Sequence, residues 1–110
     1  MGPQSTYQME EKSMDPNVKN KIKECEKVIP FLKMVSNTTR LKILCILSEG
    51  ERRVGEIQEM LGAKQSYISQ QLKYLKGNGY LTNRREGTQI YYKLVDPKFV
   101  RIMKTFREVL

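Results

Sequence analysis

The sequence contains no histidine, and only two of its 110 residues are cysteine. The absence of histidine excludes His-based general acid–base catalysis and every metal site that needs an imidazole ligand. The two cysteines, Cys25 and Cys45, are too few for the disulfide framework of a small secreted protein. No glycine-rich phosphate loop or paired-carboxylate site is present, and no base is available to activate Cys45. We therefore expect neither enzyme activity nor a cofactor.

Long apolar runs are also missing. No run approaches the ~20 residues that a membrane-spanning helix requires, and the first residues lack the basic and apolar regions of a secretory signal peptide. We therefore expect a soluble, cytoplasmic protein without a membrane partner.

Basic residues are in excess, with 20 Lys and Arg against 12 Asp and Glu and a net charge of +8. The excess is uneven, because six basic residues stand against one acidic residue between Lys64 and Lys93. A charge of this size and sign favours a polyanion or an acidic membrane surface as partner. Its concentration in one segment predicts where the partner binds.

The first third of the chain predicts a tail and a broken helix. Residues 1–15 are polar without apolar periodicity, which indicates a flexible tail ahead of a single domain at 16–110. Apolar residues at steps of three and four predict a helix over 16–35. Pro30 lies inside that pattern, so a kink or break is expected near Val28–Phe31.

The middle of the chain predicts three more helices. Asn37 is a favourable N-cap, and the apolar stretch RLKILCIL should form a buried helix that ends at Gly50. A short amphipathic helix beginning near Val54 follows, and a turn at Gly62–Lys64 leads into a longer helix that Gly77–Gly79 ends. Two short helices joined by a glycine-containing turn are typical of a helix-turn-helix.

In the last third of the chain the spacing of the apolar residues changes. From Leu81 the apolar residues alternate, which predicts a β-hairpin with its turn at Glu86-Gly87 and with Ile90, Tyr92 and Leu94 on one face. A final helix is expected over 97–110. The fold class is thus mainly α with a small β-hairpin.

The longer helix of the helix-turn-helix has an unusual polar side. Ile68, Leu72 and Leu75 make one apolar side, and the opposite side carries mostly hydroxyls and amides instead of ion pairs. Short groups that both donate and accept hydrogen bonds suit the reading of base edges in the DNA major groove. Each feature alone is also common on a solvated surface, but their order and their shared basic segment favour DNA binding.

Individual roles follow from side-chain chemistry. Gln65 and Gln70 can address adenine, Ser66 and Ser69 can reach a base edge or a phosphate, and the ring of Tyr67 can touch a thymine methyl.

Cations flank these groups. Lysines on the same helix, among them Lys76, would neutralise phosphates, and the two arginines beside the hairpin turn fit a minor groove. The predicted DNA-binding residues are Lys64, Gln65, Ser66, Tyr67, Ser69, Gln70, Lys73, Arg84, Arg85 and Thr88.

Four motifs, NTTRLKIL, VGEIQEMLG, QSYISQQLKYL and RREGTQIYYKL, carry a family resemblance. Over residues 30–110 the chain resembles the winged-helix core of the ArsR-type (arsenic-repressor) family of bacterial repressors. The resemblance implies a winged helix-turn-helix homodimer, joined through its first and last helices, that binds double-stranded DNA at a palindromic operator until an effector releases it. Family members often have His where this chain has Gln71, which bears on base preference.

The resemblance also bears on the effector. The third-helix metal motif of the family carries cysteines, whereas the matching residues 55–59 hold no thiolate, and the last-helix metal site needs a His. We therefore expect no metal. Cys45 matches the second-helix cysteine of members that sense persulfides or oxidants, so the chain is closest to the non-metal, thiol-sensing members.

Two readings of the cysteines stay open. In thiol-sensing members the partner cysteine lies on the last helix, where this sequence has none, so Cys25 is the only other candidate. A switch at Cys45 and Cys25 would respond to a reactive sulfur species or an oxidant. Both residues also lie on apolar stripes, where cysteine often serves as an inert core residue. A winged helix used for protein–protein docking is the alternative function, although such domains usually lose the basic wing.

Overall fold

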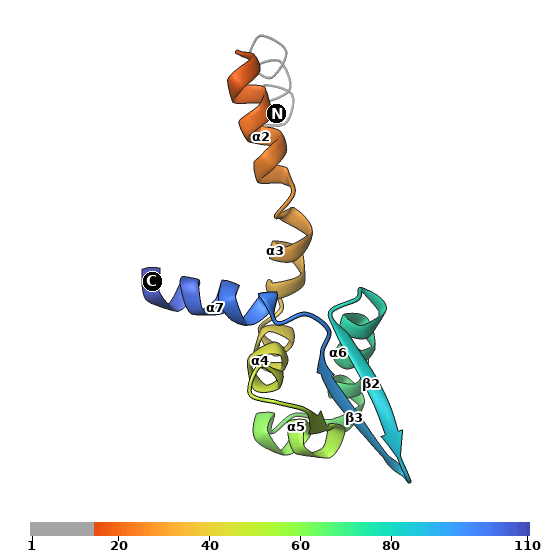
Figure 1. The fold of residues 1–110 in the computed structure, drawn as a ribbon. Helices are drawn as coiled ribbons and strands as arrows, with labels where there is room; N and C mark the ends of the chain where they lie inside the picture. Colours follow the sequence, from red (N-terminus) through yellow and green to blue (C-terminus); the bar gives the residue numbers. More distant parts are fainter. Residues whose placement is uncertain (1–14) are drawn as a thin grey trace, which may run out of the picture. The chain divides into compact units, whose positions relative to one another are not determined.

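The computed structural model describes residues 15–110, so nearly all of the tail predicted at residues 1–15 lies outside the described part. The chain divides into two compact units, the first ending at Met34 and the second comprising Val35–Leu110. The elements, labelled in Figure 1, are α2 (Pro16–Glu26), α3 (Ile29–Val35), α4 (Thr38–Leu47), β1 (Arg52–Arg53), α5 (Val54–Leu61), α6 (Gln65–Gly77), β2 (Leu81–Glu86), β3 (Gln89–Leu94) and α7 (Lys98–Val109).

The first helix is broken, as predicted. Asp15 caps α2 because its carboxylate accepts a hydrogen bond from the backbone N–H of Asn17 at 2.9 Å. The break falls at residues 27–28, at the start of the predicted interval, and α3 begins at Ile29. Pro30 explains the break, since it has no N–H to donate to the carbonyl four residues earlier and its ring would clash there.

The second predicted helix begins where expected and ends early. Asn37 caps α4, its side chain accepting from the backbone N–H of Arg40 at 3.0 Å. The helix ends at Leu47, before Gly50, which has a φ of +140°. The buried positions of α4 are Ile43, Leu44 and Leu47.

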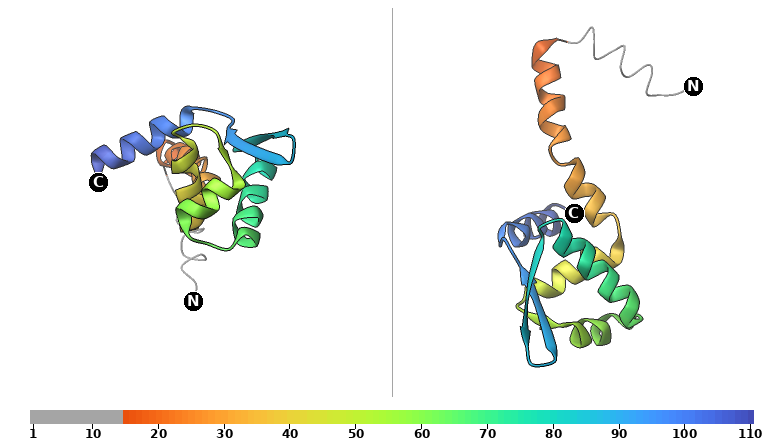
Figure 2. Two further views of the ribbon diagram at one scale, coloured as in Figure 1. Left: turned by 90° about the horizontal axis from the view of Figure 1, so that it is seen from below. Right: turned by 90° about the vertical axis from the view of Figure 1, so that its right-hand side faces the viewer.

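The helix-turn-helix forms as the glycine pattern predicts. Gly62 ends α5 in the left-handed conformation, with φ +63°, and its N–H donates to the carbonyl of Gln58 at 2.9 Å. Three residues later α6 begins, and it ends at Gly77. Figure 2 shows α5 and α6 next to the β-hairpin in the second unit.

The sheet has one strand more than the predicted hairpin. Strands β2 and β3 pair antiparallel around a two-residue loop of Gly87 and Thr88. The short strand β1 pairs with the other edge of β3, giving the order β1-β3-β2. A strand of two residues is too short to show an alternating pattern, which is why periodicity did not predict it.

One apolar core holds the second unit together. Helices α4, α5 and α6 and the sheet contribute its fully or nearly fully buried side chains: Ile43, Leu44, Leu47, Ile57, Ile68, Leu72, Leu75, Leu81 and Tyr92, with Phe99 from α7. The helix-turn-helix and the hairpin are thus anchored on a common core. Among residues 15–110 no helix is long and apolar enough to cross a bilayer.

Candidate nucleic-acid interface

Helix α6 presents three different polar sides around its buried side. Gln65, Ser69 and Lys73 recur every fourth residue and line a hollow that the hairpin turn closes with Thr88 and Gln89. Amides, hydroxyls and a cation from two elements therefore face one space. Four of these five residues were predicted to bind DNA, and the fold brings them together.

A second side of α6 points to solvent. Ser66, Gln70 and the flanking Lys64 are exposed. Neither Ser66 nor Gln70 makes a side-chain hydrogen bond to any residue within 15–110. Their donors and acceptors are therefore available to an external partner such as a base edge.

The third side of α6 faces the N-terminus of α4. The hydroxyl oxygen of Tyr67 accepts a hydrogen bond from Asn37 Nδ2 at 3.4 Å, and the guanidinium of Arg40 lies 4.1 Å from the ring centre of Tyr74. Hydrogen bonding from Asn37 is the main cause that lowers the pKa of Tyr67. Tyr67, predicted to touch a thymine, is thus tied to α4 while its side chain remains partly exposed.

Gln71 lies on the buried side of α6, with only 8% of its surface exposed. Its Oε1 accepts a hydrogen bond from Arg40 Nη1 at 3.3 Å, which links α6 to α4. The family resemblance connected this position with base preference, but its burial connects it with helix packing. Helical spacing could have predicted this burial, since Gln71 falls three residues after Ile68 and four before Leu75.

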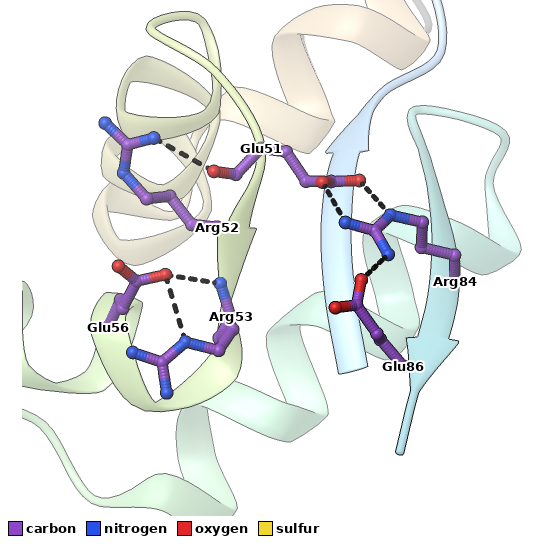
Figure 3. A network of polar contacts seen from close by, with 6 residues as sticks. All are labelled: Glu51, Arg52, Arg53, Glu56, Arg84 and Glu86. Atoms are coloured by element: carbon purple, nitrogen blue, oxygen red, sulfur yellow. Dashed lines mark hydrogen bonds and ion pairs between the residues drawn. The ribbon is translucent and has the colours of Figure 1, made fainter. Parts of the chain in front are cut away.

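The hairpin of β2 and β3 is the wing of this fold, and its two arginines, Arg84 and Arg85, are held differently. Arg84 Nε and Nη2 donate to the two carboxylate oxygens of Glu51 at 3.0 and 2.8 Å, and Nη1 contacts Glu86 (Figure 3). The guanidinium also stacks on the ring of Tyr91, 4.4 Å from its centre. The hydrogen bonds from Arg84 lower the pKa of Glu51 and, with those to Glu86, raise the pKa of Arg84 itself.

Arg85 differs from its neighbour. It is exposed, and no ion pair to it is found among residues 15–110. Its opposite residue on β3 is Ile90, which lines the hollow beside α6. Arg84 and Arg85 were predicted to share one role, and no role was predicted for Glu51, because nothing in the local sequence around Glu51 points to a partner 33 residues away.

The cysteines lie in different units of the chain. Cys25 is exposed on α2, where no residue is buried, and Cys45 is half-buried on α4. The carbonyl of Cys45 accepts a hydrogen bond from Ser48 Oγ at 2.6 Å. Within the described residues no cluster of three or more His, Cys, Asp and Glu could hold a metal ion.

A helix-turn-helix whose second helix has an exposed polar side, followed by a basic β-hairpin, defines a winged helix-turn-helix DNA-binding regulator. Residues 37–83 match the family model of the bacterial regulatory proteins of the arsR family. Together with the relatives described next, this match shows that the chain belongs to the ArsR family, as the sequence motifs predicted. The family consists of transcriptional regulators, not enzymes.

Similar proteins include regulators with different stated effects. The chain is 37% identical over 81 residues to the biofilm growth-associated repressor of Xylella fastidiosa, covering 74% of this chain and 71% of that protein. It is 36% identical over 78 residues to the transcriptional activator HlyU of Vibrio cholerae, covering 71% and 72%. A solved homodimeric winged helix-turn-helix DNA-binding domain, Mb0332 from Mycobacterium bovis, superposes with a TM-score of 0.66 at 32% identity, covering 81% of this chain and 82% of that domain.

Proposed function

We propose that this protein is a cytoplasmic homodimeric repressor that binds a palindromic operator, with residues 16–110 as its DNA-binding and dimerisation domain. The observation that carries the proposal is the exposed polar side of α6 beside a basic wing. Ser66 and Gln70 are exposed, and the hollow next to them gathers polar groups from α6 and the hairpin turn. Repression is favoured by the likeness to the Xylella repressor.

Binding would place α6 in the major groove. Ser66 and Gln70 would read base edges, because side-chain amides and hydroxyls match the donor and acceptor pattern of that groove. Lys64, Lys73 and Lys76 would contact phosphates on either side. The wing would follow the neighbouring minor groove.

Dimerisation is supported by apolar side chains that the single chain leaves exposed on, or directly beside, α2, α3 and α7. They are Val18, Val28, Ile29 and Leu32 in the first unit and Val100, Phe106, Val109 and Leu110 in the second. Exposed apolar residues that gather on one surface usually mark an interface, and a second copy of the chain would cover these side chains. A two-fold dimer presents two copies of α6 to two half-sites, which accounts for a palindromic operator.

For the effector, we propose a reactive sulfur species or an oxidant acting on Cys45. Cys45 lies on α4, and the N-cap of that helix, Asn37, and its residue Arg40 are hydrogen-bonded to side chains of α6. Modification of a half-buried thiol adds volume next to the core and would shift α4, and with it α6. Cys25 is exposed and is the other thiol of the chain.

The first experiment measures the affinity for a duplex of about 30 base pairs, long enough for two half-sites one helical turn apart, at several salt concentrations. The proposal predicts affinity that falls steeply with salt, and a salt-independent or absent affinity would favour a protein-docking module instead. The protein is then treated with a polysulfide or a disulfide-forming oxidant, and its intact mass is recorded. Affinity should collapse on treatment and survive in Cys45→Ser. A response that is also lost in Cys25→Ser would assign Cys25 as the partner thiol, and a response that is kept there would assign the modification to Cys45 alone. Equal affinity in all states would remove the thiol effector.

A further inference from the structure

Arg84 and Arg85 point to opposite faces of the hairpin, because neighbouring residues of a strand alternate. Arg85 pairs with Ile90 and so shares the face that carries Ile90 and the buried Tyr92, next to α6. Arg84 pairs with Tyr91 and shares the outer face. Only one of the two arginines therefore lies on the side of the recognition helix.

The contacts of Arg84 span the whole sheet. From β2 its guanidinium crosses the ring of Tyr91 on β3. It reaches Glu51, which lies immediately before β1 (Figure 3). Two parallel hydrogen bonds to the carboxylate of Glu51 fix both the distance and the orientation between it and the guanidinium of Arg84. With Glu86 on the third nitrogen, two carboxylates offset the single positive charge.

The wing needs such a link. A two-stranded hairpin is marginally stable alone, and β1 adds a ladder of only two residue pairs to the far edge of β3. The contact between Arg84 and Glu51 connects strand β2 directly to the segment that leads into α5. It therefore restrains the angle between the hairpin and the helix-turn-helix.

We infer that Arg84 is a positioning residue that holds the wing through Glu51 and Tyr91, and that Arg85 is the wing cation that meets DNA. The inference rests on the proposed DNA-binding function and deepens it. Together, Arg84, Tyr91 and Glu51 are called the wing clasp below.

The first test does not involve DNA. Amide hydrogen exchange of β2 and β3 is compared in the free wild-type protein and in Glu51→Gln, Arg84→Ala and Arg85→Ala. Removal of an ion pair at this exposure should speed exchange of the wing amides about two- to five-fold in the first two variants, and Arg85→Ala should leave it unchanged. Unchanged exchange in Glu51→Gln and Arg84→Ala would overturn the wing clasp whether or not the protein binds DNA.

The second test uses the sign of an effect on DNA affinity, measured with the same duplex of about 30 base pairs. Glu51→Gln removes a negative charge, so electrostatics alone predicts tighter binding. The wing clasp predicts binding weaker by about two- to five-fold. Glu49→Gln is the matched control, because Glu49 is exposed two residues away and no contact of its side chain is found within residues 15–110.

Arg84→Lys completes the test. Lysine keeps the charge but cannot make the forked contact with Glu51, so this variant should bind as weakly as Glu51→Gln. Wild-type affinity in Arg84→Lys, with tighter binding in Glu51→Gln, would make Arg84 a phosphate contact and overturn the inference. A wild-type protein with no salt-dependent affinity would instead refute the proposed function, and the exchange measurement would still decide the wing clasp.

Discussion

The recognition helix and the wing are held in place by different forces. Helix α6 is anchored by Ile68, Leu72 and Leu75, all fully buried. The wing is anchored at its base by Leu81 and Tyr92, but its outer half depends on the wing clasp, an exposed polar contact. Apolar burial contributes more stability than an exposed ion pair. Helix α6 should therefore be the rigid element of the interface and the wing the adjustable one.

Truncating the anchor of α6 should have the largest effect. Leu72→Ala should lower the free energy of unfolding by about 2–5 kcal/mol, because it removes a fully buried side chain and leaves a cavity. Chemical denaturation measures this decrease. Arg84→Ala, the corresponding change in the wing, should cost far less, and equal decreases would mean that the two elements are not held differently.

The outward side of α6 should control sequence preference. Gln70→Ala should reduce discrimination at one base pair of each half-site by about 1–3 kcal/mol, because alanine cannot form the paired amide hydrogen bonds to a base edge. Selection from a random-sequence library followed by affinity measurement gives the change. A uniform weakening over all sequences would show that Gln70 does not read bases, and Gln71→Ala, which alters a buried position, is the control for indirect effects.

The exposed cation of the wing should affect binding without changing preference. Arg85→Ala should weaken binding to every duplex and reduce the slope of log affinity against log salt by about 0.9 for each phosphate that is no longer neutralised. Titration of salt with wild type and variant in parallel measures the slope. An unchanged slope would remove Arg85 from the interface and leave the wing without a DNA-contacting arginine.

Local patterns predicted the elements that local residues determine. Apolar spacing located the helices, Pro30 located the break between α2 and α3, and Gly62 located the turn of the helix-turn-helix. Strand β1 could not be predicted in this way, because its two residues are ordered by pairing with a strand about 40 positions later.

The sequence predicted which residues belong to the candidate site more completely than it predicted what each of them does. Charge and side-chain type identified both wing arginines, but Arg84 finds its carboxylate partner 33 residues away, a contact that only the fold creates. The burial of Gln71 was predictable from helical spacing, yet its bond to Arg40 on α4 was not. Residue types thus predicted a candidate DNA-binding surface, and contacts within the fold separate the groups that remain available from those that are already engaged.

The smallest expected effect is the pH dependence of the wing clasp. The pKa of Glu51 is lowered in the folded protein by hydrogen bonds from Arg84, below its ordinary value of 4.5. A carboxyl group with a lowered pKa stabilises the fold above its ordinary value and loses that contribution as the pH falls through the folded pKa. The difference in melting temperature between wild type and Glu51→Gln should therefore be present near neutral pH and shrink at pH values below about 4.5. A difference that persists in acid would mean that the carboxylate charge of Glu51 does not hold the wing.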